Sequence, residues 1–416
     1  MKKDSQLENK TRAASHYQYY PDEKNIPIYL AYGFRPSFLL LAPYMILSMI
    51  LWILVWSGVL NITFMNDTLT WHVYEMLFGV LTIGTLAFLA TAIPELFPGS
   101  VPLVGKKLKY IIYLWILGRI SFWLIDITGI YLAAILNLAM LGWIIWFARI
   151  VILDRLQRHA SIGYTIIALF FIEVWFFASQ VGLAKTDSMD ILKVALGAIV
   201  VLVLLALRRV NMEAVNEIME DKGIDDIFLS RPPKTNLAIF TVMLFTIVEF
   251  LYPNSTTLGW IGLATSAAIL GITSDYILKD KFILNQSYVL YLASIYIMLS
   301  IGYGLIGWDL LNPNFYGINQ FRHFITIGGV GLSYIMVMII VSWVHTGRHL
   351  TSNIYTHLIV LLIIIAAFMR GLIPFFFEHT YELNLLSSIA WILSFLLYLK
   401  AFSKFLLSPR ADGILG

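Results

Sequence analysis

Two histidines, His72 and His323, are the residues of this chain whose type and position best suit metal chemistry. Each stands at the start of an apolar stretch, and ionisable side chains in such stretches are rare and usually functional. Neutral imidazole is also the most common metal ligand among protein side chains. If both stretches begin at the same membrane face, the two imidazoles can bind one shared metal ion or haem. The alternative is that both are interfacial residues that hydrogen-bond to backbone carbonyls or water.

The composition of the chain defines the elements that must position these histidines. Hydrophobic residues make up 59% of the sequence and charged residues only 13%, which excludes an ordinary soluble protein. Runs of about 18–22 mainly apolar residues, long enough to cross ~30 Å of hydrocarbon, recur twelve times. We therefore expect an all-α polytopic membrane protein with about 12 transmembrane helices. The expected spans are 37–58, 71–94, 109–125, 130–150, 163–183, 191–207, 236–252, 257–277, 287–306, 322–344, 354–376 and 386–407.

Residues 1–36 form an expected cytoplasmic N-terminal tail, which precedes a single transmembrane domain, 37–408. The tail has no short apolar core followed by a small-residue cleavage site, so we expect no signal peptide there. The longest predicted loop, 208–234, carries six acidic residues and ends with two prolines and a lysine. It should form a short cytoplasmic helix and a turn between the sixth and seventh spans.

The distribution of Lys and Arg predicts the orientation, because positive residues near span ends stay on the cytoplasmic side. Most of the 28 Lys and Arg residues fall in the tail, in alternate loops and after the last span. Both chain ends are therefore expected in the cytoplasm. The opposite side holds Lys185, Lys193, Arg322 and Arg370, and Arg119 lies within a span.

This topology divides the histidines between the two membrane faces. His72, His323 and His379 fall at the outer face; His159, His345, His349 and His357 fall at the inner face, and His16 lies in the tail. His323 and His345 stand 22 residues apart, which corresponds to about 33 Å along a helix. These two cannot share a site, so each face offers a candidate site of its own.

The outer face suits a haem held by His72 and His323. Haem needs two axial ligands from opposite sides, and imidazoles from two facing helices can supply them. Glu75 and Met76 share a helix face with His72 because they follow it at i+3 and i+4, so both are candidate cofactor contacts. The absence of cysteine rules out thiolate ligation and covalent c-type haem, and we expect haem b.

Two further features of the outer face agree with a haem. Arg322 and Arg370 could pair with haem propionates, because Arg binds carboxylates through two bonds; ordinary anchoring to lipid headgroups is the alternative. The glycines of residues 328–331 would let a flat ring approach closely, although such glycines also serve helix packing.

At the inner face, His345, His349 and His357 form a candidate set of metal ligands. Three imidazoles suit copper or zinc. His345 and His349 share a helix face only if the helix continues past Gly347. The alternative is a solvated turn with Arg348 at the headgroups.

Arg119 is a charge deep within the predicted span 109–125. Such a charge costs at least ~2.5 kcal/mol unless it is paired. Glu173, in the predicted span 163–183, reaches a similar depth in the membrane. We therefore expect Arg119 and Glu173 to form a buried structural ion pair.

Several short motifs occur in order along the chain. They are Phe-Arg-Pro at 34–36, a Trp-His opening followed by Glu-Met-Leu-Phe-Gly at 71–79, Phe-Leu-x-Thr-Ala-x-Pro at 88–94, Leu-Gly-Arg at 117–119 and His-Thr-Gly-Arg at 345–348. In these motifs the chain resembles the NnrS family of bacterial membrane proteins over nearly its whole length. Tyr74 stands where the family has a second histidine, and residues 208–215 also depart from the family pattern, so the chain resembles a divergent member.

The resemblance implies a twelve-span protein of the bacterial inner membrane that is associated with haem and copper. It also implies a role in the response to nitric oxide and nitrosative stress. Lipid bilayer and haem are the expected partners, together with nitric oxide or other respiratory membrane proteins. The basic residues are explained by topology, so no nucleic acid partner is expected.

Catalytic subunits of haem–copper oxidases offer an analogy for the fold. They also have twelve spans, and they hold a low-spin haem with histidines near the outer ends of helices two and ten, the positions of His72 and His323. Their copper-binding histidines on helices six and seven have no counterpart here. Reduction of dioxygen at a two-metal centre is therefore disfavoured, and only the helical arrangement is expected to be shared.

Three functional classes stay open at this point. The resemblance and the histidine pair favour a haem protein of the nitric oxide response. A haem or copper handling factor for the assembly of respiratory oxidases is one alternative. A polytopic transporter is the other, and it would predict interrupted helices and polar groups around the midplane.

Overall fold

The structure, a computed structural model, describes residue 20 and residues 26–62, 64–65, 67–97, 99–154, 159–224, 227–277, 283, 285–312, 317–414 and 416. Within these ranges every regular element is a helix. The predicted all-α class is therefore confirmed. His16, in the predicted tail, lies outside the described residues.

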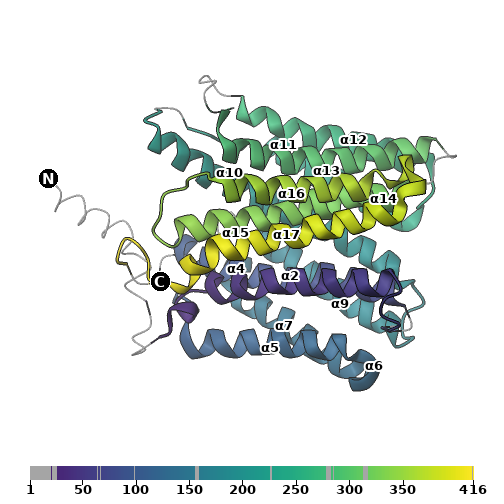
Figure 1. The fold of residues 1–416 in the computed structure, drawn as a ribbon, viewed down its shortest axis with the longest axis horizontal. Helices are drawn as coiled ribbons and strands as arrows, with labels where there is room; N and C mark the ends of the chain where they lie inside the picture. Colours follow the sequence, from purple (N-terminus) through teal and green to yellow (C-terminus); the bar gives the residue numbers. More distant parts are fainter. Residues whose placement is uncertain are drawn as a thin grey trace.

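Long helices lie side by side along the length of the molecule (Figure 1). They are α2 (Phe34–Trp56), α4 (Val80–Leu96), α5 (Gly105–Trp123), α7 (Ile130–Phe147), α9 (Ala160–Gln180), α10 (Ser188–Asp221), α11 (Pro232–Leu251), α12 (Thr256–Ile272), α13 (Ser287–Leu311), α15 (Leu332–Val344), α16 (Ile354–Gly371) and α17 (Thr380–Leu407). The short α-helices are α3 (Thr68–Tyr74), α6 (Ile125–Thr128), α8 (Arg149–Ile152) and α14 (Ile318–His323). Single turns of 3-10 helix are η1 (Ile28–Leu30), η3 (Thr273–Tyr276), η6 (Ile373–Phe375) and η7 (Phe377–His379). Two π-helical segments, η2 (Glu75–Gly79) and η5 (Phe324–Gly331), join α3 to α4 and α14 to α15.

Eleven helical segments of the described chain are long and apolar enough to cross a membrane, as expected of a multi-pass membrane protein. The remaining predicted span, 109–125, corresponds to α5, which is not among the eleven. α5 carries four basic residues, Lys106, Lys107, Lys109 and Arg119, and these make it less apolar than its neighbours. It still packs along α7 within the bundle. It is therefore aligned with the other helices, although it is less apolar than they are.

The two ends of the bundle carry different elements. The turn η1 and Gly416 lie at one end, which we call the Arg35 end, and α6 and α14 lie at the other, the His323 end (Figure 1). Arg35 is fully buried. Its guanidinium donates hydrogen bonds to the carbonyls of Phe405, Leu406, Ser408 and Gly416. A cation is favourable at the C-terminal end of a helix, so Arg35 joins the first long helix to the end of the last one.

Glycine allows α12 and α13 to approach each other closely. A Cβ atom added at Gly262 would lie 2.9 Å from the Cα of Gly307, and one added at Gly307 would lie 2.6 Å from the carbonyl oxygen of Gly259. Small residues at such crossings let membrane helices gain van der Waals contact along their backbones. This pair of helices therefore depends on the absence of side chains at the crossing.

The predicted loop 208–234 is only partly a loop. Residues 208–221 continue α10 as one helix. The next helix, α11, begins at Pro232, and proline suits the first turn of a helix. The short predicted helix is thus the end of α10. Residues 225–226 of this segment lie outside the described residues.

Candidate functional site

His72 and His323 lie at the same end of the bundle, each close to the end of a short helix. His72 belongs to the last turn of α3 and is half-buried. Its imidazole stacks on the indole of Trp52 from α2, with ring centroids 4.0 Å apart and planes inclined by 14°. This stacking holds the ring orientation without using either ring nitrogen.

His323 is oriented by a hydrogen bond to the backbone. It is the last residue of α14, and its Nδ1 lies 3.1 Å from the carbonyl oxygen of Gln320. A carbonyl can only accept, so this contact assigns the proton to Nδ1 and leaves the lone pair on Nε2. Histidines that bind metals commonly donate their other ring nitrogen to a carbonyl in this way.

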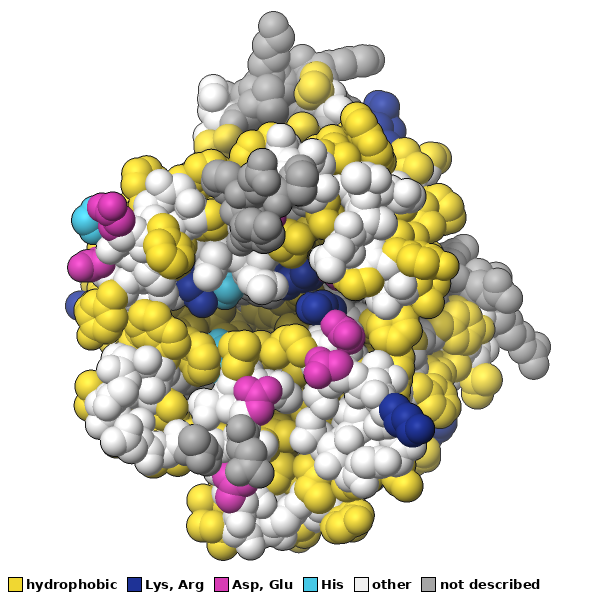
Figure 2. All heavy atoms as spheres, turned by 90° about the vertical axis from the view of Figure 1, so that its right-hand side faces the viewer, with side chains coloured by type: hydrophobic (Ala, Val, Ile, Leu, Met, Phe, Trp, Pro, Cys, Tyr) yellow, Lys and Arg dark blue, Asp and Glu magenta, His cyan; other side chains and the backbone are white. Residues whose placement is uncertain are grey.

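Arg370, in the last turn of α16, is close to both imidazoles. Its charge interacts electrostatically with His72 and with His323, and the two histidines interact with each other. Among the described residues, the Arg370 guanidinium has no hydrogen-bond or ion-pair partner. Figure 2 faces this end of the bundle and shows a hollow with a hydrophobic floor. Histidine, Lys and Arg side chains lie around it, and Asp and Glu side chains lie beside the Lys and Arg on one side. A hollow with these groups suits an apolar ligand that carries a negative charge.

Arg322 is engaged elsewhere. Its guanidinium binds the Glu249 carboxylate of α11 through two contacts of 3.2 and 2.7 Å. The prediction grouped Arg322 with Arg370 as partners of haem propionates. The structure separates the two, because Arg322 already has a carboxylate partner from the protein.

Each histidine helix changes to a π-helix beside its histidine. The segment η2 begins at Glu75, three residues after His72, and η5 begins at Phe324, directly after His323. Stretches of π-helix are rare and often mark functional sites. Sequence periodicity did not predict either segment, since an extra residue in a turn leaves no local signal beyond the glycines of 328–331.

Glu75 is the centre of a buried polar network that faces α5. Arg119 contacts Glu75 Oε1 at 2.5 Å, while the Tyr44 hydroxyl and the Trp123 indole donate to Oε2 at 2.5 and 2.6 Å. Arg119 also donates a hydrogen bond to Asn137 of α7. Both oxygens of Glu75 are therefore occupied by protein donors, and its predicted contact with a cofactor needs correction. Met76, by contrast, is half-buried and packs against the hydrophobic core.

The prediction that Arg119 and Glu173 form an ion pair is wrong, because the direct partner of Arg119 is Glu75. Glu173 accepts a hydrogen bond of 2.6 Å from the hydroxyl of Tyr74, and the ring of Tyr74 stacks between Phe122 and Phe176. Arg119 reaches Glu173 only through a longer-range electrostatic interaction. Tyr74 thus faces α9.

At the Arg35 end the three candidate metal ligands have three separate partners. His345 Nδ1 lies 3.0 Å from Glu95, His349 Nδ1 lies 3.6 Å from Asp221, and His357 bonds to the Tyr291 hydroxyl. Across the described ranges, no group of three or more His, Cys, Asp or Glu could hold a metal ion. The predicted grouping of these imidazoles is corrected, because α15 ends before Gly347 and the following loop spreads them apart.

The fold and this site define a polytopic helical membrane protein with a histidine-lined hollow at one end of its bundle. The sequence model described as NnrS protein matches residues 28–410. The chain therefore belongs to the NnrS family. No solved structure and no curated protein matches it.

Proposed function

We propose that the protein binds one b-type haem between His72 and His323 and takes part in the bacterial response to nitric oxide. Membership of the NnrS family supports the role in this response. The observation that carries the haem proposal is Arg370, a half-buried guanidinium beside two imidazoles. Among the described residues it has no hydrogen-bond or ion-pair partner. A partly buried cation of this kind calls for an anionic group, and a haem propionate is such a group.

The donor set fits haem in two further respects. His323 keeps Nε2 available because Nδ1 bonds to Gln320, and the stacking of His72 on Trp52 leaves both of its ring nitrogens available. A haem ligated by two imidazoles is low-spin and suits electron transfer. The residues of the chain would orient the ligands through Gln320 and Trp52, and Arg370 would neutralise a propionate.

An absorption spectrum of the purified protein tests this proposal. We expect a Soret band with low-spin features, and we expect His72→Ala and His323→Ala each to give a high-spin or haem-free protein. His379→Ala is the matched control at the same end of the bundle, because His379 is exposed and its imidazole has Glu382, 4.0 Å away, as its one ion-pair partner among the described residues. A low-spin spectrum that His323→Ala leaves unaltered would reject the site.

We also propose that the protein lies in the inner membrane with its Arg35 end on the cytoplasmic side. Most Lys and Arg residues lie toward this end, and positive residues near span ends stay on the cytoplasmic side. A reporter that is active only in the cytoplasm should work when fused after Gly416 and fail when inserted at Gly182. The opposite pattern of reporter activity would contradict this orientation.

A further inference from the structure

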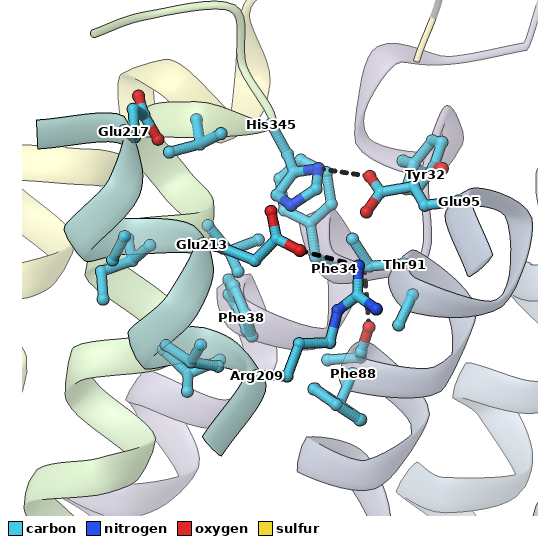
Figure 3. A pocket seen from close by; sticks show the side chains of 18 of the residues that line it. Tyr32, Phe34, Phe38, Phe88, Thr91, Glu95, Arg209, Glu213, Glu217 and His345 are labelled. Carbon is cyan, nitrogen blue, oxygen red and sulfur yellow. Dashed lines mark hydrogen bonds and ion pairs between the residues drawn. The ribbon is translucent and has the colours of Figure 1, made fainter. Parts of the chain in front are cut away.

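A second hollow lies at the Arg35 end, far from the histidine pair. It has a volume of about 310 Å³ and opens between α2, α4, α10 and α15. Its floor is formed by aromatic and aliphatic side chains such as Phe34, Phe38 and Phe88. Its walls carry charged groups, which converge on the same space in Figure 3. The cavity is much larger than one water molecule and has polar groups on its walls, and a site of this kind has room and hydrogen-bond partners for ordered water.

A second cavity lies next to the first, toward the middle of the bundle. This smaller cavity of about 70 Å³ shares Phe38, Phe88 and Val337 with the first one. It ends at Gly84 and Tyr334, where a Cβ on Gly84 would lie 2.2 Å from the Tyr334 ring. Tyr334 stands 11 residues from His323 and 11 from His345, so this path reaches half-way along the helix. Most of the side chains that line the smaller cavity are apolar, and its polar side chains are the hydroxyl groups of Thr85, Ser333 and Tyr334. The Ser333 hydroxyl also donates a hydrogen bond to the Val330 carbonyl.

His345 and Glu95 form the protonatable pair on the wall of the larger cavity, with Nδ1 and Oε1 3.0 Å apart. Several other ionisable groups surround this pair. They are Glu213 and Glu217 of α10, Arg209 of α10, which pairs with Glu213 at 3.0 Å, His349 of the following loop, and Arg410, which donates to the His345 carbonyl. Histidine and carboxylate chains inside membrane proteins commonly mark proton pathways.

We propose that the two cavities form a water-filled vestibule that connects the Arg35 end with the middle of the bundle. The pair of His345 and Glu95 takes up protons from this water and returns them to it, and the hydroxyl groups around Tyr334 form hydrogen bonds with water at the far end. The contacts that carry this inference involve neither His72 nor His323. It goes beyond the haem proposal and stands without it.

The absence of cysteine in the natural sequence makes a direct test of water access possible. Thr91→Cys places a thiol on the wall of the larger cavity, and Leu132→Cys places one on the exposed side of α7. Only a hydrated thiol ionises and reacts readily. The membrane-impermeant reagent trimethylammonium-ethyl methanethiosulfonate should therefore modify Thr91→Cys at least roughly tenfold faster than Leu132→Cys. The reaction should occur from one side of membrane vesicles.

Ser333→Cys tests the inner half of the path. The smaller cavity is too narrow for the trimethylammonium reagent, so silver ion is the probe, and protection against later alkylation is the readout. We expect protection at Ser333→Cys and none at Leu132→Cys. A Thr91→Cys thiol that reacts from neither side, or a Ser333→Cys thiol that silver does not protect, would overturn the vestibule.

Proton exchange has a separate readout. Thr91 lies one turn before Glu95, so the charge of the pair alters the reactivity of a thiol at Thr91→Cys. We expect the modification rate to show one inflection with pH beyond that of the thiol itself. Glu95→Gln combined with His345→Gln should remove this inflection without abolishing modification. If Thr91→Cys showed the same pH profile with and without the Glu95→Gln and His345→Gln changes, proton exchange by the pair would be rejected. The accessibility measurements test the presence of water separately.

Discussion

Arg119 and Glu75 form an ion pair of 2.5 Å between α5 and the π-helical segment η2. Both side chains are buried, and Glu75 follows His72 by one helical turn. The pair therefore ties the helix that carries His72 to α5. Since Tyr44 of α2 and Trp123 of α5 donate to the same carboxylate, three helices meet at Glu75.

Breaking this ion pair on one side should destabilise the protein strongly. Glu75→Gln or Arg119→Met leaves one buried charge without a partner, and such a loss costs roughly 3–5 kcal/mol. The double variant should lose much less, because no charge is stranded. Denaturant unfolding in detergent measures the free energies.

Glu173→Gln is the matched control for the direct partner of Arg119. Glu173 accepts from Tyr74 rather than from Arg119, and a glutamine can accept the same bond, so this variant should cost less than either single change in the ion pair. A loss equal to that of Glu75→Gln would return Glu173 to the role of direct partner.

Replacing Arg370 should weaken haem binding more than it weakens the fold. Arg370→Leu removes a charge-assisted hydrogen bond to a propionate, worth about 1.5–3 kcal/mol, or roughly a tenfold to hundredfold change in affinity. Titration of the apoprotein with haem measures this change.

Arg322→Leu separates binding from stability in the same experiment. It strands Glu249, so it should lower the free energy of unfolding. Arg322→Leu combined with Glu249→Leu should restore stability and bind haem like the natural protein. If that double variant bound haem as weakly as Arg370→Leu, the assignment of Arg370 as the propionate partner would fail.

Alanine at Gly262 should loosen the crossing of α12 and α13. The added Cβ would meet the backbone of Gly307 at 2.9 Å, and overpacking of this kind costs about 1–3 kcal/mol. Gly271→Ala on the same helix is the control, because a Cβ there has no atom within 4 Å. It should be neutral or slightly stabilising. Thermal unfolding distinguishes the two, and equal effects would contradict the close approach.

Acid should release the segment after α17 from the Arg35 end. Burial raises the pKa of Asp412, but hydrogen bonds from Arg410 and from the Ile414 amide outweigh it and hold that pKa below its usual range. The lowered pKa means that these contacts stabilise the segment above the pKa of the unfolded chain. The stabilisation is lost as the pH falls through the lower, folded value. Amide exchange at Ile414 should accelerate over that window, and Asp412→Asn should remove this pH dependence.

Hydropathy was sufficient to predict the fold class, because an apolar run of ~20 residues crosses a bilayer as a helix and has few alternatives. The same alternation of spans predicted that His72, His323 and Arg370 would lie at one end, and the structure brings them close to one another. α5 shows where composition alone is a weaker guide. Its lysines lower its hydropathy, yet it packs along α7 with the other helices.

The partners of buried charges could not be predicted in this way. The helical rise predicts the depth of a residue, and Arg119 and Glu173 match in depth. The direction of each side chain depends on how neighbouring helices are rotated, and no local pattern encodes that rotation. Glu75 was a second carboxylate within a span. The packing turns it toward Arg119 and leaves Glu173 to Tyr74.

The contact of Arg35 with the end of α17 has a consequence for the order of events during synthesis. Its acceptors Phe405 and Leu406 follow it by 370 and 371 residues. At roughly 5–20 residues per second, these carbonyls leave the ribosome about 20–70 s after Arg35 does. Through that interval the guanidinium must stay near the headgroups or with a chaperone. A chain that stops before α17 would lack these carbonyl acceptors at the start of its first span, a defect that a membrane quality-control protease could recognise.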